Sequence, residues 1–401
     1  MQIHRIALLG DKDHGKSTFV GNMLMLTKSI SDARIEEAKR ASRELGRPFE
    51  PGFLLDSFSE EREDAMTIDT TRAQIQYKGM GFELIDVPGH EELISNMLTG
   101  ASNASLGVLI VSAKKGEGIS EQTKRHIVLS IMLGMDRLVV GVNKIDTVGY
   151  SKGAFDAIKD ELSSFIENIG RSLGNVDASF VPISAYNGDN LIKLSKNTRW
   201  YKGKPLVQIL KNYAVQKDGS ARGLRAAVQG AFENGIACKI ISGEIKVNQK
   251  VVALPSGRYM KIEKIIKAGH DVKSASRGDS PILVLGDYTG IERGTIISAE
   301  NGRPKVGSNV KALIFLVDIP RNPSIRIGLQ EANSSIIIDQ ELDLKSGNLA
   351  KCTKAKALGI YTANLKADKK VVYEAFRDNP ELGRFSIYDG RKCAGLGIIL
   401  G

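Results

Sequence analysis

The sequence has few cysteines and no long apolar run. Its three cysteines, Cys238, Cys352 and Cys393, are far apart and form no C-x-x-C pair. This argues against a disulfide framework or a zinc site and favours a reducing cytoplasm. No uninterrupted apolar stretch approaches the length of a membrane-spanning helix, so no membrane partner is expected. The chain runs directly into strand-like residues, and we therefore expect no signal peptide.

With 401 residues the chain is too long for one hydrophobic core, and two or three domains are expected. The formal net charge of +10 points first to nucleic acid as a partner. The lysines are nevertheless spread along the chain, with no dense basic block. A solvated basic surface and a polyanion-binding surface therefore both stay open.

Residues 10–18, with the sequence GDKDHGKST, match the pattern G-x-x-x-x-G-K-[ST] at every fixed position. They follow an apolar run at 6–9 and precede a helix-compatible segment, which is the context of a phosphate-binding loop (P-loop). Backbone N–H groups in such a loop, with the N-terminus of the next helix, attract a phosphate. Lys16 is expected to bridge the outer phosphates and Ser17 to ligate Mg²⁺. The predicted nucleotide-binding residues here are Asp13, His14, Gly15, Lys16, Ser17 and Thr18, of which His14 contributes only its backbone.

A second motif, Asp86-Val87-Pro88-Gly89-His90, follows the strand-like run at 82–85. An aspartate at the carboxyl end of a strand can hold a Mg²⁺-bound water. The backbone N–H of Gly89 can then sense the γ-phosphate. Asp86 and Gly89 are therefore predicted to bind the nucleotide.

Two further motifs indicate which base is bound. The run Asn143-Lys144-Ile145-Asp146 ends an apolar strand at 138–142, and its last carboxylate can accept both N–H donors on the edge of guanine. Adenine lacks that donor pair. Ser184-Ala185 ends another apolar run and is expected to close over the base. A single polar cap after a strand is common, but four such motifs in order indicate a guanine nucleotide, bound by Asn143, Lys144, Asp146, Ser184 and Ala185.

The motifs resemble the G domain of the translation-factor GTPases, the family of elongation factor Tu and elongation factor 1-alpha. The resemblance covers residues 1–215 and implies an α/β P-loop domain with a mostly parallel, doubly wound sheet. The alternating apolar pattern agrees, because strands alternate with predicted helices. The helical patterns lie at 31–46, 91–98, 122–133, 154–169 and in a last segment ending near 213.

The resemblance also implies GTP hydrolysis to GDP and phosphate, with Mg²⁺ as cofactor. The segment 54–69 is similar to the family's first switch, so Thr67 is expected to coordinate the metal together with Ser17. Asp64-Ala65 departs from the Arg-Gly or Gln-Gly usual there, which restricts the backbone. His90 matches the histidine that orients the attacking water. The predicted catalytic residues are His90, Lys16 and Thr67.

After a polar linker at 216–220, short β-rich runs broken by turns replace the helical pattern. Residues 222–302 and 306–401 are each predicted to form a small all-β barrel. Both resemble the two barrels that follow the G domain in this family. The resemblance therefore spans the whole chain.

Three functional readings are open within the family. The segments 351–361 and 379–389 look most like the GTPase subunit of heterodimeric ATP sulfurylase, which couples GTP hydrolysis to sulfate activation on a partner subunit. We therefore expect a regulatory subunit of sulfate adenylyltransferase, with the small adenylyltransferase subunit as partner. Residues 382–385 also resemble elongation factor 1-alpha, and the positive charge suits tRNA. The alternatives are an elongation factor that delivers aminoacyl-tRNA to the ribosome, and a translation-like GTPase with an unrelated partner.

Overall fold

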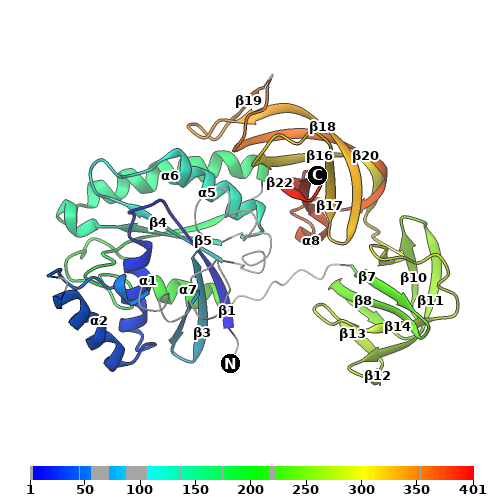
Figure 1. Cartoon of the computed structure of the whole chain (residues 1–401), viewed down its shortest axis with the longest axis horizontal. Coiled ribbons are helices and arrows are strands. Elements are labelled where there is room, and N and C mark those ends of the chain that lie inside the picture. Colours follow the sequence, from blue (N-terminus) through cyan, green and yellow to red (C-terminus); the bar gives the residue numbers. More distant parts are fainter. Residues whose placement is uncertain are drawn as a thin grey trace. The chain divides into compact units, whose positions relative to one another are not determined.

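The computed structural model describes residues 3–44, 46–55, 72–86, 106–135, 137–173, 176–215, 223–352 and 354–401. The chain divides into two units. The first comprises Met1–Lys217 and Asp343–Asn348, and the second Asp218–Leu342 and Leu349–Gly401. Figure 1 shows the helices and strands of each unit.

The first unit is built on a six-stranded sheet in the order β2-β3-β1-β4-β5-β6. Its strands are β1 (Ile3–Leu9), β2 (Arg72–Tyr77), β3 (Met80–Asp86), β4 (Leu106–Ser112), β5 (Arg137–Asn143) and β6 (Asp177–Pro182). All neighbouring pairs are parallel except β2 with β3. Every residue of β4 is buried, as expected for a central parallel strand covered on both faces.

Helices cover both faces of this sheet. The helices of the described part of the unit are α1 (Lys16–Leu26), α2 (Asp32–Glu44), α5 (Glu121–Met132), α6 (Lys152–Leu173) and α7 (Leu206–Val215), with the 3-10 helix η2 (Ile145–Val148). Phe19 of α1 and Leu210 of α7 share a core cluster with Ile6 and Val108 of the sheet. Figure 1 shows α5 and α6 on the opposite face. The helices predicted at 31–46, 122–133, 154–169 and before 213 are thus confirmed, whereas the one predicted at 91–98 lies outside the described residues.

The first barrel of the second unit is antiparallel and closed. The order β10-β15-β7-β8-β14-β11 returns to β10 through a β10–β11 pairing, and β12 pairs with β11. The strands are β7 (Arg225–Phe232), β8 (Gly235–Ser242), β9 (Glu244–Lys246), β10 (Lys250–Leu254), β11 (Arg258–Lys267), β12 (His270–Val272), β13 (Ser274–Ser276), β14 (Ile282–Leu285) and β15 (Ile296–Ala299). Along β11 the side chains of Met260, Ile262 and Ile265 are buried in the barrel core.

The second barrel closes in the same way. Its order β17-β21-β22-β16-β20-β18 returns to β17 through a β17–β18 pairing, and β19 pairs with β18. Its elements are β16 (Lys305–Leu316), β17 (Pro323–Ile327), β18 (Gln330–Leu342), β19 (Leu349–Lys351), β20 (Gly359–Tyr373), α8 (Pro380–Gly383), β21 (Arg384–Asp389) and β22 (Lys392–Ile399). The predicted fold class, a P-loop α/β domain followed by two barrels, is confirmed. The domain limits at 215, 222, 302 and 306 stay predictions.

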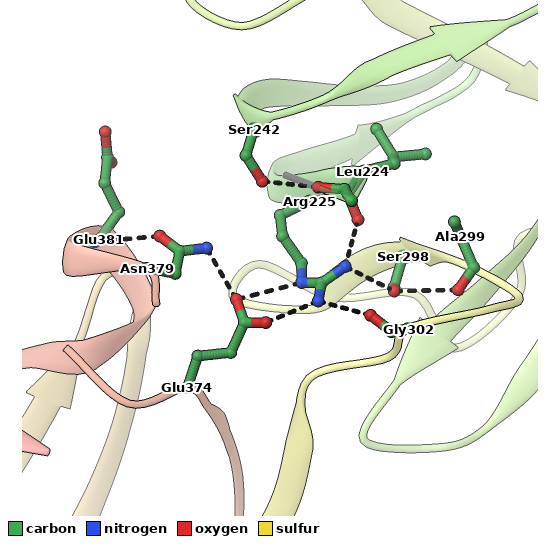
Figure 2. A network of polar contacts seen from close by, with 10 residues as sticks. Leu224, Arg225, Ser242, Ser298, Ala299, Gly302, Glu374, Asn379 and Glu381 are labelled. Carbon is green, nitrogen blue, oxygen red and sulfur yellow. Dashed lines mark hydrogen bonds and ion pairs between the residues drawn. The ribbon is translucent and has the colours of Figure 1, made fainter. Parts of the chain in front are cut away.

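A buried ion pair joins the two barrels within the second unit (Figure 2). Arg225 of β7 donates from Nη2 to Glu374 Oε1 over 2.6 Å and from Nε to Oε2 over 3.2 Å. The same guanidinium donates to the carbonyl oxygens of Leu224 (2.9 Å) and Gly302 (2.6 Å). An apolar cluster that includes Val252 and Leu254 of the first barrel and Val372 and Leu382 of the second packs beside it.

The hairpin between β18 and β19 belongs partly to the first unit. Within that unit, the Lys345 carbonyl accepts a hydrogen bond from Lys124 Nζ of α5 (3.1 Å). The Ser346 carbonyl accepts one from Asn168 Nδ2 of α6 (2.9 Å). These two helices therefore bind the backbone of a hairpin that is distant in sequence.

Candidate nucleotide-binding site

The loop between β1 and α1 depends on its two glycines. Gly10 has φ 142° and Gly15 has φ 90°, a backbone region that other residues rarely adopt. A Cβ atom on Gly10 would lie 2.4 Å from the Ile110 carbonyl oxygen, and one on Gly15 would lie 2.5 Å from Asn143 Nδ2. Only glycine at both positions lets the loop pass this close to β4 and β5.

Lys16 is the first residue of α1, and its side chain arches back over the loop. Its Nζ atom donates to the carbonyl oxygens of Gly10 (2.8 Å) and Asp11 (3.0 Å). The first turn of α1 contains no acidic residue, so the positive end of the helix dipole is not neutralised locally. An ammonium group and a helix N-terminus therefore face the place where an anion would bind.

A cavity of about 840 Å³ opens beside this loop. The predicted site residues that line it are Asp13, Gly15, Lys16, Ser17, Thr18, Asn143, Lys144, Asp146, Ser184 and Ala185. They come from the loop, from the start of α1, from the end of β5, from η2 and from the segment that follows β6. The carboxyl ends of parallel strands thus meet at one edge, which is where α/β sheets bind ligands. His14 is buried, and burial lowers the pKa of its imidazole.

Asn143 ties the phosphate-binding loop to the segment expected to close over the base. Its Nδ2 donates to the His14 carbonyl oxygen (2.8 Å), and its Oδ1 accepts from the Ala185 backbone N–H (2.8 Å). From the other side, Asn22 of α1 donates to the carbonyl oxygens of Ala185 (2.7 Å) and Tyr186 (3.0 Å). Asn143 therefore positions two loops. Asn22, which sequence reasoning missed, binds only the segment at 185–186 and ties it to α1.

Lys144 is held by a carboxylate that was not predicted. It has φ 59°, and its Nζ lies 2.6 Å from Glu117 Oε2. Ser112 Oγ donates to the same oxygen (2.7 Å), and Lys114 lies 3.0 Å from Oε1. The hydrogen bond from Lys144, followed by that from Ser112, lowers the pKa of Glu117 to about 2. The ammonium group is thus fixed at one side, and the lysine stem lies along the cavity wall.

A second unpredicted carboxylate connects the loop to α5. Asp11 Oδ2 accepts hydrogen bonds from Thr123 Oγ1 (3.0 Å) and from the hydroxyl of Ser120. Ser120 is the N-cap of α5, where it forms a capping box with Thr123. Nothing in the sequence indicated Asp11 as the partner of this cap.

Three predicted residues, Thr67, Gly89 and His90, lie outside the described residues. Asp86 ends β3, and its backbone pairs with Leu8 of β1, two residues before Gly10. Ser17 lines the cavity, and its hydroxyl oxygen is a ligand of the kind that Mg²⁺ prefers. The described residues include no group of three or more His, Cys, Asp or Glu side chains that could hold a metal ion by themselves. The Ser17 hydroxyl would supply one oxygen ligand to a magnesium ion bound together with the phosphates.

Comparison with known proteins identifies the family. Residues 1–215 match the model of the elongation factor Tu GTP-binding domain. Elongation factor 1-alpha of Sulfurisphaera tokodaii is 32% identical over 98% of this chain and 96% of its own length. This chain belongs to the elongation factor Tu and elongation factor 1-alpha family of GTPases. Such a G domain binds GTP and GDP and hydrolyses GTP, as the sequence predicted.

Other comparisons cover the remaining parts of this GTPase. Residues 318–400 match a model of the GTP-eEF1A C-terminal domain. Elongation factor 1-alpha of Methanosarcina barkeri is 32% identical over 96% of this chain and 94% of its own. The crystal structure of Sup35 with GDP covers 100% of this chain and 94% of its own at 24% identity and a TM-score of 0.44. Neither of the two elongation factor 1-alpha relatives supports the predicted sulfate adenylyltransferase subunit. No helix in the described ranges is long and apolar enough to cross a membrane.

Proposed function

We propose that this GTPase is an elongation factor of the 1-alpha type, which delivers aminoacyl-tRNA to the ribosome in the cytoplasm. The observation that carries the proposal is the extent of the similarity. Relatives named elongation factor 1-alpha align with 98% of the chain, so both barrels are included. The match of residues 318–400 to an eEF1A C-terminal domain supports the same reading. The resemblance of the barrels to a sulfurylase subunit gains no such support.

In this proposal, base recognition, loop positioning and phosphate binding are carried out by different residues of the cavity. The Asp146 carboxylate accepts the two N–H donors of guanine, while Asn143 holds the two loops around the nucleotide. Lys16 leaves the carbonyl oxygens of Gly10 and Asp11 and stabilises charge on the phosphates.

The remaining roles concern the metal and the attacking water. Ser17, Thr67 and Asp86 would hold Mg²⁺ directly or through water, and the bound ion would neutralise charge on the phosphate oxygens. His90 orients the water that attacks the γ-phosphate, as the family resemblance implies.

The test measures capture of aminoacyl-tRNA by the full chain at moderate salt. With GTP, we expect tight retention on a filter and protection of the aminoacyl ester from hydrolysis. With GDP, both signals should fall by at least about tenfold, as for a ligand whose affinity depends on the nucleotide state. Retention that is equal with GTP and GDP and declines steeply with salt would reveal only a basic surface and would overturn the proposal.

The matched control is Asp146→Asn, because an amide presents a donor where guanine needs an acceptor. This variant should capture aminoacyl-tRNA with xanthosine triphosphate and not with GTP. If the variant still binds xanthosine diphosphate but captures aminoacyl-tRNA with neither triphosphate, nucleotide binding does not control tRNA capture. That result would count against the proposal.

A further inference from the structure

A small hollow in the first unit combines aromatic rings with lysines, away from the nucleotide cavity's lining. It lies between the start of α6 and the turn at 200–202 and has a volume of about 360 Å³. We call it the aromatic hollow, and the residues used here are Lys152, Phe155, Lys159, Trp200, Tyr201 and Lys202. Its volume is near the lower end of the range of small-ligand pockets, ~300–1,000 Å³.

The aromatic floor is pre-formed. The Phe155 ring is buried and lies 5.4 Å from the Trp200 ring and 6.3 Å from the Tyr201 ring. Trp200 Nε1 donates to the Tyr150 carbonyl oxygen (3.0 Å), and the Tyr201 hydroxyl donates to the Lys204 carbonyl oxygen (3.0 Å). Burial raises the pKa of Tyr201 to about 12. The polar atoms of both rings therefore have partners within the protein, and both residues are partly exposed.

Lysine side chains line the aromatic hollow, and acidic groups of the protein neutralise only part of their positive charge. Lys152 forms an ion pair with Asp156 (2.5 Å), and Lys202 Nζ donates to the neutral Arg199 carbonyl (2.8 Å). The Lys159 ammonium has no hydrogen-bond or ion-pair partner within the described ranges. Two cations therefore remain beside the rings.

The chain around this turn is strongly basic. From Tyr186 to Pro205 it has one acidic residue, Asp189. The basic residues of the same segment are Lys193, Lys196, Arg199, Lys202 and Lys204. An anionic partner is thus favoured over a neutral one.

We propose that the aromatic hollow binds single-stranded RNA, with a base on the Trp200 and Tyr201 rings and the adjoining phosphates on Lys159 and Lys202. Stacking on aromatic rings together with lysine contacts to phosphates is how proteins hold unpaired nucleotides without reading their sequence. An acidic peptide would use the lysines and leave the ring faces unused. The choice of RNA over DNA rests on the proposed function, which gives the protein RNA partners.

Trp200 is the only tryptophan of the chain, so tryptophan fluorescence reports on the aromatic hollow alone. An eight-nucleotide oligouridylate, added to the GDP-bound full chain, should quench the tryptophan fluorescence in a saturable way. Labelled oligouridylate gives the affinity independently by anisotropy. Trp200→Ala should weaken binding about 5- to 150-fold, the usual loss of one stacked base, whereas Trp200→Phe should stay within about threefold.

The paired variant Lys159→Ala/Lys202→Ala removes both phosphate contacts. It should flatten the slope of log affinity against log salt by about 1.4, because each phosphate contact to a single strand contributes ~0.7. Lys193→Ala/Lys196→Ala is the matched control, since both lysines are exposed in the same segment and do not line the hollow. It should change the slope by less than about 0.5. GDP binding by each variant verifies that it is folded.

The proposal is supported if quenching is saturable and if only Lys159→Ala/Lys202→Ala changes the salt dependence of the affinity. Absence of quenching, or equal slope changes in both lysine variants, overturns it and leaves a solvated basic surface. Oligothymidylate binding more tightly than oligouridylate overturns the choice of RNA. These measurements use GDP and no aminoacyl-tRNA. Their failure is therefore distinct from a failure of GTP-dependent capture.

Discussion

Loss of the Glu374 charge should loosen both barrels of the second unit, because the Arg225 guanidinium would stay buried without its counter-charge (Figure 2). The exposed fraction of the side chain is 6% for Arg225 and 17% for Glu374. Glu374 also accepts a hydrogen bond from Asn379 Nδ2 (2.7 Å), the residue that caps α8 through the Glu381 N–H (3.2 Å). The carboxylate therefore connects β7, the end of β20 and α8.

The expected cost follows from this geometry. Removing one partner of a buried ion pair usually costs ~3–5 kcal/mol. We take the lower end for Glu374→Gln, because the amide keeps an oxygen that can accept from Arg225. The guanidinium also retains its bonds to the Leu224 and Gly302 carbonyls. A tenfold change in an equilibrium constant corresponds to ~1.36 kcal/mol. A loss of ~3 kcal/mol in the free energy of opening therefore makes opening of the barrels about 150-fold more frequent.

Hydrogen exchange of the full chain, followed by mass spectrometry of peptides from β7 and β20, measures that opening. Peptides from β4 in the first unit should exchange at the parental rate. Asp318→Asn is the control, since its pair with Lys392 has side chains 44% and 74% exposed. An exposed pair contributes less than ~1 kcal/mol. Exchange in this control should rise less than about fivefold.

A double substitution makes the test sharper. Arg225→Met/Glu374→Leu removes both charges, and replacing a buried pair by apolar groups is often close to neutral. The double variant should therefore exchange more slowly than Glu374→Gln. The reasoning is refuted if Glu374→Gln accelerates exchange no more than Asp318→Asn does, or if the double variant is the least stable of the three.

Three further predictions concern the nucleotide site. Asp146→Asn should lower GDP affinity at least about 100-fold and raise affinity for xanthosine diphosphate, measured by competition; unchanged GDP affinity contradicts the base assignment. His90→Ala should slow single-turnover GTP hydrolysis about 100-fold or more with nearly normal GDP affinity, and a parental rate would mean that another group orients the water. Because folding lowers the Glu117 pKa to about 2, the stability it contributes is present above about pH 4.5 and is lost as the pH falls toward 2. In acid titration, Glu117→Gln should lose less stability than the parent in this window; an identical profile contradicts the role of the Lys144 bond.

Local pattern was enough to predict the sheet and most helices, and many of the residues that it indicated for nucleotide binding line one cavity. The P-loop could be found because each of its fixed positions has a steric or electrostatic reason that does not depend on distant residues. Gly10 and Gly15 are needed for their backbone conformation. Lys16 and Ser17 are placed by the helix that they begin. Such requirements can be recognised in the nine consecutive residues 10–18.

The supporting contacts were not visible, because they join residues far apart in the chain. Asn22 looks like an ordinary buried helix residue until α1 is packed beside Ala185. Glu117 lies in a turn where a charged residue is common, and its bond to Lys144 depends on how β4 and β5 pair. Arg225 and Glu374 are 149 positions apart. No periodicity or spacing relates such pairs.

The same difference between local and distant contacts explains why the motifs could name GTP and not the partner. The residues predicted to recognise the nucleotide are concentrated in Asp146 and the P-loop, and Asn143 joins the P-loop to the segment after β6 by binding the His14 carbonyl and the Ala185 N–H. Partner choice depends on surfaces spread over the domain and the barrels, where single residues are weakly constrained. Short barrel segments pointed to a sulfurylase subunit, but alignment of nearly the whole chain favours elongation factor 1-alpha. Each residue of a partner-binding surface is only weakly constrained. Similarity over the whole chain therefore indicates the partner better than similarity over a few short segments does.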